Sequence, residues 1–310
     1  MSVLVPIRQA CAGACTKCNS LNPQCRVGVL DLPPDEAIAL FEALSDPRFQ
    51  AGAADDQDRL IDVAARVAED YRAGFPSLSA QISTLRRDIR PNGLVVINSL
   101  PVVHDSQRTV AVVGAILGRL TRFADEGNYI IAIKEQLTQS GDRPSFANSR
   151  PFFLHIDRSY APEPPEYFGM HAVWNNQGEG GRSTFCDINL ATRFLTPEVL
   201  HELQLPNFLF PAPAHCRGGE RVCESILTQD GDGWRVRFRR DNLASKTRAG
   251  IEAVIALIQA MNRATFEMML STNSIVLINN RTFLHGRTAF VASGDAHTPR
   301  HLNRAYISSH

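Results

Sequence analysis

Apolar residues recur at helical spacing through the N-terminal part of the chain. Leu60, Val63 and Val67 lie three or four positions apart in a segment that we predict to be a helix over residues 55–74. The same pattern predicts helices over residues 33–44, 77–89 and 104–120. Short apolar runs rich in β-branched residues predict two strands among them, at residues 93–98 and 130–134.

The pattern changes after Asp157, where short apolar segments alternate with turns rich in Gly, Pro and Asn. Strands are predicted at residues 167–174, 182–187, 208–211, 225–228, 234–239, 274–278 and 304–307. This spacing is typical of an antiparallel sandwich or barrel. One long helix, over residues 246–270, is expected to interrupt it. The sequence therefore predicts an α+β protein whose strands are concentrated in the second half.

Composition narrows the class of protein. The chain has 310 residues, of which 44% are hydrophobic, enough for one large domain with a substantial core. Lys plus Arg and Asp plus Glu both number 32, so there is no basic excess of the kind that nucleic-acid binding requires. No apolar run approaches the roughly 20 residues that span a bilayer. The beginning of the chain does not resemble a signal peptide, and we expect a cytoplasmic protein with reduced cysteines.

Four of the 7 cysteines cluster near the N-terminus: Cys11, Cys15, Cys18 and Cys25. Four thiolates at such spacing can bind a second metal, either Zn²⁺ or an iron–sulfur cluster. The alternative is an irregular leader whose cysteines bind nothing. We therefore divide the chain into a Cys-rich leader, residues 1–30, and a single domain with a helical annex, residues 31–310.

A second group of candidate metal ligands begins at His155-Ile156-Asp157. On a strand, His155 and Asp157 point to the same face because strand side chains alternate. His285, which follows the apolar strand predicted at 274–278, can supply another imidazole. Two imidazoles and one carboxylate hold one face of a non-haem iron and leave three positions open. The alternative is a structural His–Asp pair without metal.

Arginines follow the second histidine. Arg300 and Arg304 share a face if this segment is a strand, and a guanidinium binds a carboxylate through a planar two-pronged contact. A dicarboxylate co-substrate that chelates iron needs such an anchor at its far end. If Arg300 is not this anchor, Arg304 and Arg287 are the alternatives.

These motifs resemble the Fe(II)/2-oxoglutarate-dependent dioxygenases of the taurine dioxygenase superfamily, and most of all its clavaminate synthase-like branch. The resemblance covers about residues 90–307. It rests on His155-Ile-Asp157 with the following Pro-Glu-Pro-Pro, Gly180-Gly181-Arg182-Ser183-Thr184, Asn279-Asn280-Arg281 with His285-Gly286-Arg287, and Arg300 with Arg304.

The resemblance implies a double-stranded β-helix, or jelly-roll, core flanked by N-terminal helices and one long inserted helix. It implies that His155, Asp157 and His285 bind Fe(II), and that 2-oxoglutarate and O₂ are co-substrates. Arg300 and Thr184 would bind 2-oxoglutarate, and Arg304 the carboxylate of the substrate. It also places a substrate side-chain contact near Asp241, where a charged strand edge is the alternative.

The implied reaction is oxidation of an unactivated C–H bond in a small amino-acid-like metabolite, free or bound to a carrier protein. The outcome is hydroxylation, desaturation or cyclisation, whereas the intact Asp157 argues against halogenation. The alternative is a non-catalytic metal- or redox-sensing protein that works through the cysteines between Cys11 and Cys25.

Overall fold

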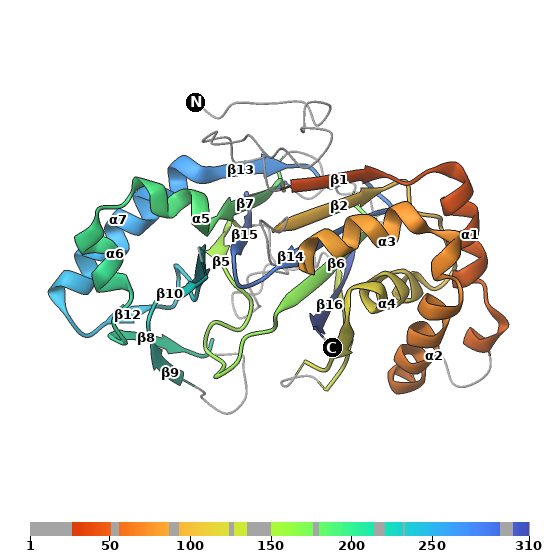
Figure 1. Ribbon diagram of the computed structural model, residues 1–310, viewed down its shortest axis with the longest axis horizontal. Coiled ribbons are helices and arrows are strands. Elements are labelled where there is room, and N and C mark those ends of the chain that lie inside the picture. The colour runs from red at the N-terminus through yellow and green to blue at the C-terminus, as the bar shows by residue number, and fades with distance from the viewer. Residues whose placement is uncertain are drawn as a thin grey trace.

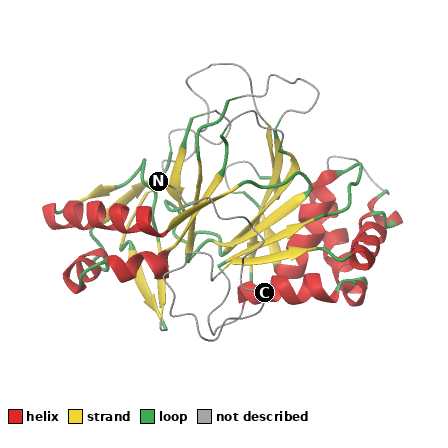
Figure 2. Cartoon of the chain, turned by 90° about the horizontal axis from the view of Figure 1, so that it is seen from above, coloured by secondary structure: helices red, strands yellow, loops and turns green. Residues whose placement is uncertain are grey.

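Two β-sheets lie face to face in the middle of the molecule, and helices cover their outer sides (Figures 1 and 2). The computed structural model describes residues 27–50, 56–86, 93–123, 127–134, 150–175, 180–213, 221–231, 233–291 and 300–309. In Figure 2 the helices stand at the two ends of the molecule and the strands fill the space between them.

The larger sheet has the strand order β1-β2-β14-β6-β16-β3, with β4 also paired to β16. Its strands are β1 (Val27–Asp31), β2 (Leu94–Asn98), β3 (Arg119–Thr121), β4 (Ile130–Lys134), β6 (Tyr167–Trp174), β14 (Ser274–Asn279) and β16 (His301–Ser308). All of its pairings are antiparallel except that of β1 with β2. The expected leader of residues 1–30 is therefore too long at its C-terminal end, because residues 27–30 already belong to this sheet.

The smaller sheet is antiparallel throughout and has the order β13-β7-β15-β5. Its strands are β5 (Phe152–His155), β7 (Ser183–Asp187), β13 (Thr265–Met268) and β15 (Phe283–Arg287). Beside it lie two short sheets, made by β8 (Phe208–Pro211), β9 (Arg221–Glu224) and β12 (Ala244–Ser245), and by β10 (Leu227–Asp230) and β11 (Gly233–Val236).

Helices pack on the outer faces of both sheets. On the larger sheet, α3 (Pro76–Ser83) and α4 (Ser106–Leu117) contact the strands, and α1 (Pro34–Leu44) and α2 (Gln57–Asp70) pack on these helices. On the smaller sheet, α5 (Ile188–Ala191) and α7 (Arg248–Ala264) contact the strands, and α6 (Pro197–Leu203) packs on α7. The single helix expected over residues 246–270 ends at Ala264, because the chain then pairs with the edge of β7 as β13.

The alternation of side chains explains why both faces of the larger sheet are apolar. In β14 every residue is buried. Ile275 and Leu277 pack toward the helices α1–α4, whereas Val276 and Ile278 pack into the core between the two sheets. A strand that is covered on both sides is apolar at nearly every position. This is why β14 contains a continuous apolar run.

A buried carboxylate joins two of the helices. Glu36 of α1 is 4% exposed and accepts hydrogen bonds from the backbone amides of Ser77 and Leu78, at 2.9 and 3.0 Å. These amides lie in the first turn of α3, where no preceding residue of the helix can accept from them. The side chain of Phe75, the residue before α3, provides no such cap.

We expect Glu36→Ala to lower the free energy of unfolding by about 1–3 kcal/mol, because two first-turn amides of α3, one of them buried, lose their acceptor. Glu42→Ala is the matched control, since Glu42 is an exposed residue of the same helix. Urea denaturation of the two variants measures the difference. Equal unfolding free energies would contradict this role for Glu36.

Candidate metal centre

The short strand β5 delivers the first histidine and then ends. His155 is its last residue, and the amide of Ile156 donates a hydrogen bond to the carbonyl of Phe238 instead of continuing the ladder. Asp157 therefore lies in the turn that follows β5, not on the strand itself. The next residue, Arg158, has a φ of 52°, a left-handed conformation that turns the chain sharply after Asp157.

The second histidine comes from the neighbouring strand. His285 of β15 is the direct Cα partner of His155 in the antiparallel pair. Opposite residues on such a pair project from the same face, and here that face looks into the core between the sheets. Phe185, the partner of His285 in β7, belongs to that core.

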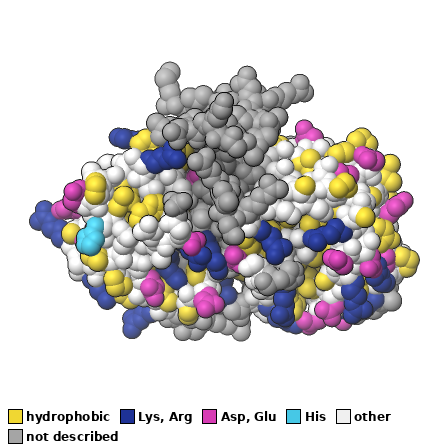
Figure 3. Space-filling model, viewed as in Figure 1, with side chains coloured by type: hydrophobic (Ala, Val, Ile, Leu, Met, Phe, Trp, Pro, Cys, Tyr) yellow, Lys and Arg dark blue, Asp and Glu magenta, His cyan; other side chains and the backbone are white. Residues whose placement is uncertain are grey.

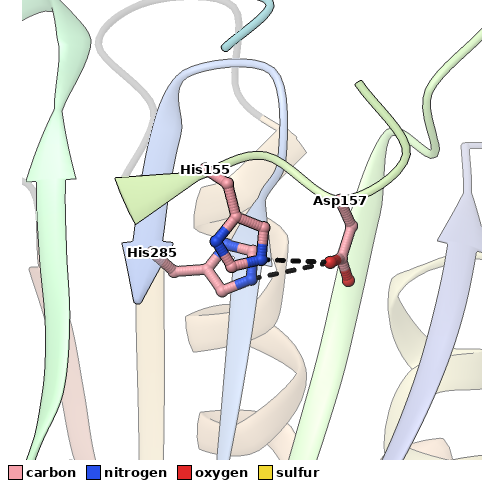
Figure 4. A group of neighbouring side chains, drawn as sticks. All are labelled: His155, Asp157 and His285. Atoms are coloured by element: carbon pink, nitrogen blue, oxygen red, sulfur yellow. Dashed lines mark ion pairs between the residues drawn. The ribbon is translucent and has the colours of Figure 1, made fainter. Parts of the chain in front are cut away.

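The three side chains converge (Figure 4). Nε2 of His155 lies 3.6 Å from Oδ1 of Asp157, and Nε2 of His285 lies 3.7 Å from the same oxygen. The three candidate ligand atoms all lie within 4.8 Å of one another. The side chains of His155 and Asp157 are 2% and 7% exposed, so this group is shielded from water.

The charge states suit metal binding. Burial would raise the pKa of the Asp157 carboxyl, but the nearby charge of Arg304 and the two imidazoles hold it below its usual range. Burial, together with the neighbouring His155, lowers the pKa of His285 well below its ordinary value, although Asp157 opposes this. The centre therefore combines a carboxylate with a neutral imidazole at His285, and both are forms that bind cations.

The tautomer of His155 is set by the backbone. Its Nδ1 lies 2.7 Å from the carbonyl oxygen of Phe153, so Nδ1 carries the proton and donates it. Nε2 is thereby left as the nitrogen directed toward Asp157 and His285. Among the described residues this buried nitrogen has no hydrogen-bond partner. A buried imidazole nitrogen beside a carboxylate and a second imidazole is a donor set that fits a divalent metal such as iron.

The structure brings Arg304 to this centre. Its Nη1 lies 3.4 Å from Oδ2 of Asp157. The guanidinium carbon also lies 5.2 and 5.5 Å from the ring centroids of Phe123 and Tyr306, which stack on each other. Arg304 is therefore held by two aromatic rings with one edge toward the metal face.

Arg300 immediately precedes β16 and is 7% exposed. Its guanidinium carbon lies 5.9 Å from the centroid of the Phe290 ring, and that of Arg287 lies 4.6 Å from the same ring. Arg287, two residues after His285 in β15, also donates a hydrogen bond to the carbonyl of Arg150 at 2.7 Å. Two buried arginines thus share one aromatic ring next to β15.

The side chain of Thr184 points away from the candidate metal ligands. It pairs with Gly286, so its side chain lies on the opposite face of the smaller sheet from that of His285. A Cβ at Gly286 would come within 2.8 Å of Oγ1 of Thr184, which confirms that the two residues share a face. Thr184 lines a groove with Ile258 and Met261 of α7.

Ser183 is the hydroxyl on the metal side. It pairs with Arg287, is 7% exposed and precedes Thr184 by one position, so it projects toward the inner core. The family resemblance placed the hydroxyl partner at Thr184, within the segment Gly180-Gly181-Arg182-Ser183-Thr184. Strand alternation relative to the inward-facing Phe185 is the signal that distinguishes Ser183 from Thr184.

Asp241 is already paired. Its carboxylate accepts hydrogen bonds from Nε and Nη2 of Arg239 at 2.7 and 3.1 Å. Burial would raise the pKa of Asp241, but these bonds and the charge of Arg239 lower it. Arg239 forms a β-bridge with His155, so the pair lies close to the metal group. The expected candidate second site at Cys11, Cys15, Cys18 and Cys25 lies outside the described residues.

The family is shown by its sequence model. The model of the taurine catabolism dioxygenase TauD, TfdA family matches residues 57–209 and 221–306. The chain therefore belongs to the TauD/TfdA family of dioxygenases. This confirms the expected class of enzyme, a dioxygenase. A search of curated proteins found no match to the sequence.

Solved structures share the fold. Asparagine oxygenase in complex with Fe(II), 3-hydroxyasparagine and succinate is 18% identical, with a TM-score of 0.80 over 91% of this chain and 93% of that one. The non-haem iron oxygenase OrfP with Fe, succinate and (3S)-hydroxy-L-Arg is 19% identical, with a TM-score of 0.76 over 91% of this chain and 94% of that one. OrfP has also been solved with Fe and α-ketoglutaric acid.

The surface carries mixed charge on the face in Figure 3, where basic and acidic side chains of the described residues are interspersed. Within the described part of the chain, each helix is too short or too polar to cross a membrane.

We expect the full chain to bind one Co²⁺ or Fe²⁺ ion at the group formed by His155, Asp157 and His285. His155→Ala should weaken binding by more than the ~10–100-fold that loss of a supporting partner costs, because it removes a ligand. His201→Ala, at an exposed position of α6, is the control. Anaerobic calorimetric titration measures both affinities. Unchanged binding by His155→Ala would exclude this group as the metal site.

Proposed function

We propose that this dioxygenase oxidises an unactivated C–H bond of a small amino-acid-like substrate, with hydroxylation as the outcome, and that His155, Asp157 and His285 hold its iron. The observation that carries the proposal is the convergence of two imidazoles and one carboxylate at a buried centre beside Arg304. Iron bound there supplies O₂ activation, driven by oxidation of 2-oxoglutarate to succinate and CO₂. Asp157 fills the carboxylate position, which argues for hydroxylation rather than halogenation.

We assign the paired sheets to a double-stranded β-helix core, with α7 as its long inserted helix. Such a core places rigid strands around a shared interior, and two of the three ligands come from adjacent strands of the smaller sheet. Rigid strands hold ligands more accurately than loops do.

Arg300 is our candidate anchor for the distal carboxylate of 2-oxoglutarate, with Ser183 replacing Thr184 as the hydroxyl partner. Ser183 is supported by its position on the inward face, opposite Arg287. The guanidinium groups of Arg287 and Arg300 both lie near the Phe290 ring, which limits their freedom, so a planar carboxylate meets a preorganised donor.

Arg304 is our candidate for the carboxylate of the amino-acid substrate. Its place beside Asp157 brings a substrate held by this guanidinium close to the iron. The stacked rings of Phe123 and Tyr306 restrict Arg304 and exclude water around it. The products bound in the solved structures of asparagine oxygenase and OrfP are hydroxylated amino acids, which supports this class of substrate.

The ion pair between Arg239 and Asp241 favours a substrate without a cationic side chain. A cationic group would have to compete with Arg239 for a carboxylate that already accepts two hydrogen bonds. A neutral or acidic side chain avoids this cost and can accept from Arg239.

The direct test is substrate-triggered succinate formation by the Fe(II)-loaded chain, with O₂ uptake measured in parallel over a panel of amino acids and their carrier-bound forms. We expect stimulation by amino acids with neutral or acidic side chains and none in His155→Ala. If no member of the panel stimulates succinate formation, the proposed substrate class is wrong. Stimulation by arginine or lysine alone would contradict the role of the Arg239–Asp241 pair.

Two arginine variants separate the anchors. Arg300→Ala should raise the KM for 2-oxoglutarate, and Arg304→Ala the KM for the amino acid, each by about 10–100-fold, because charge-assisted hydrogen bonds are lost. Arg248→Ala, with a side chain 92% exposed on α7, is the control. Iron content is measured in each variant, since Arg304 also contacts Asp157. If Arg300→Ala instead raised the KM for the amino acid and Arg304→Ala that for 2-oxoglutarate, the two assignments would be reversed.

A further inference from the structure

The backbone of Asp157 is held by a side chain instead of a strand. Because β5 ends at His155, the sheet ladder does not reach Asp157. Its amide donates to Oδ1 of Asn280 at 2.8 Å, and its carbonyl accepts from Nδ2 of the same Asn280 at 3.1 Å. The side-chain amide of Asn280 thus takes the place of a peptide group on a neighbouring strand, with one donor and one acceptor.

Asn280 is held in place by its burial and by two further hydrogen bonds. It is fully buried, at 0% exposure. Its Nδ2 also donates to the carbonyl of Pro165 at 2.9 Å, and its own backbone amide donates to the carbonyl of Glu166 at 2.9 Å. The segment that follows Asp157 is therefore tied to Asn280 at both of its ends.

Asn280 lies in the turn that connects β14 to β15, so its hydrogen bonds link Asp157 to the strand that carries His285. It is the first residue after β14, in the turn that leads to β15, and it precedes His285 by five positions. The turn that sets the start of the His285 strand thus also fixes the backbone of the carboxylate ligand. Two candidate ligands that lie 128 residues apart in sequence are connected through one buried amide.

The rest of the turn after Asp157 is braced separately. Arg237 donates to the carbonyls of Ser159, Ala161 and Pro162 at 2.7, 2.6 and 2.9 Å. These bonds stabilise the turn beyond the left-handed Arg158, but they are made two or more residues after Asp157. The two backbone hydrogen bonds of Asp157 itself both go to Asn280.

We propose that Asn280 is a positioning residue that sets the Asp157 carboxylate relative to the imidazole of His285 and thereby determines metal affinity. The inference rests on the proposed iron site. Asn280 does not touch the metal; it acts through Asp157. Without its amide, the Asp157 backbone loses both partners, and the carboxylate samples orientations that do not bring Oδ1 toward both imidazoles.

The test measures Co²⁺ affinity of the metal-free full chain by anaerobic calorimetry, together with the visible absorption of bound Co²⁺, which reports ligand geometry. Asn280→Ala removes the amide. Asn279→Ala is the matched control, because Asn279 is the preceding residue and its side chain accepts only from the Arg281 amide among the hydrogen bonds described. Thermal unfolding of each metal-free variant establishes that the protein titrated is folded.

We expect Asn280→Ala to weaken Co²⁺ binding by about 10–100-fold with an altered absorption spectrum, and Asn279→Ala to stay within about twofold of the unsubstituted chain. In a chain that already carries Asp157→Ala, adding Asn280→Ala should lower the Co²⁺ affinity by less than about twofold. The reason is that Asn280 acts through the Asp157 carboxylate, which this variant lacks. If Asn280→Ala does not fold, Asn280→Ser replaces it, since a hydroxyl is too short to bridge both backbone groups, and the same loss is expected.

Equal Co²⁺ affinity of the Asn280 and Asn279 variants would overturn the inference while leaving the metal site intact. An undiminished effect of Asn280→Ala on the Asp157→Ala background would also overturn it, because the effect would then be general destabilisation. Failure of the unsubstituted chain to bind Co²⁺ would instead remove the proposed metal site itself.

Discussion

The antiparallel pairing of β5 with β15 is the constraint on which the centre depends. It places His155 directly opposite His285, so both imidazoles project from one face of the smaller sheet into the space between the sheets. Gly286, the next residue in β15, leaves room on the other face, where a Cβ would come within 2.5 Å of the Phe152 carbonyl oxygen and 2.8 Å of the Thr184 hydroxyl. A slip of one residue in this pairing would turn His285 away from the core.

The layered architecture excludes water from this interior, so interactions between charged groups are strong there. Helices α3 and α4 lie on the outer face of the larger sheet and α5 and α7 on that of the smaller one, so the space between the sheets is enclosed by residues that are themselves buried. In such surroundings a lone carboxylate would be protonated. Arg304 compensates for the burial of Asp157, and the pKa of that carboxyl is lowered despite it. The same arginine is thus suited to bind a substrate carboxylate next to the proposed iron ligands.

The sequence was sufficient to predict that His155, Asp157 and His285 come together, and to predict a mixed α+β architecture, because both predictions depend on local patterns. The His-x-Asp segment and His285 are each recognisable within a few residues. Details that depend on pairing between distant segments were less accessible. The strand β1 was missed because its parallel partner β2 begins more than sixty residues later, and β13 was taken as helix because only its pairing with β7 makes it a strand. Thr184 was preferred to Ser183 because the face of each residue depends on the register with β15. The asparagine at position 280 was visible as part of a motif, but its contact with Asp157 arises only in the folded chain.

The central claim is that His155, Asp157 and His285 bind one iron and leave adjacent positions for 2-oxoglutarate. The most direct measurement is a crystal structure of the full chain grown without oxygen in the presence of Fe(II) and 2-oxoglutarate. The account predicts one metal bound by Nε2 of both histidines and by the Asp157 carboxylate, with 2-oxoglutarate on the same metal and its distal carboxylate at Arg300. A metal held by other residues, or 2-oxoglutarate bound away from these three side chains, would contradict it.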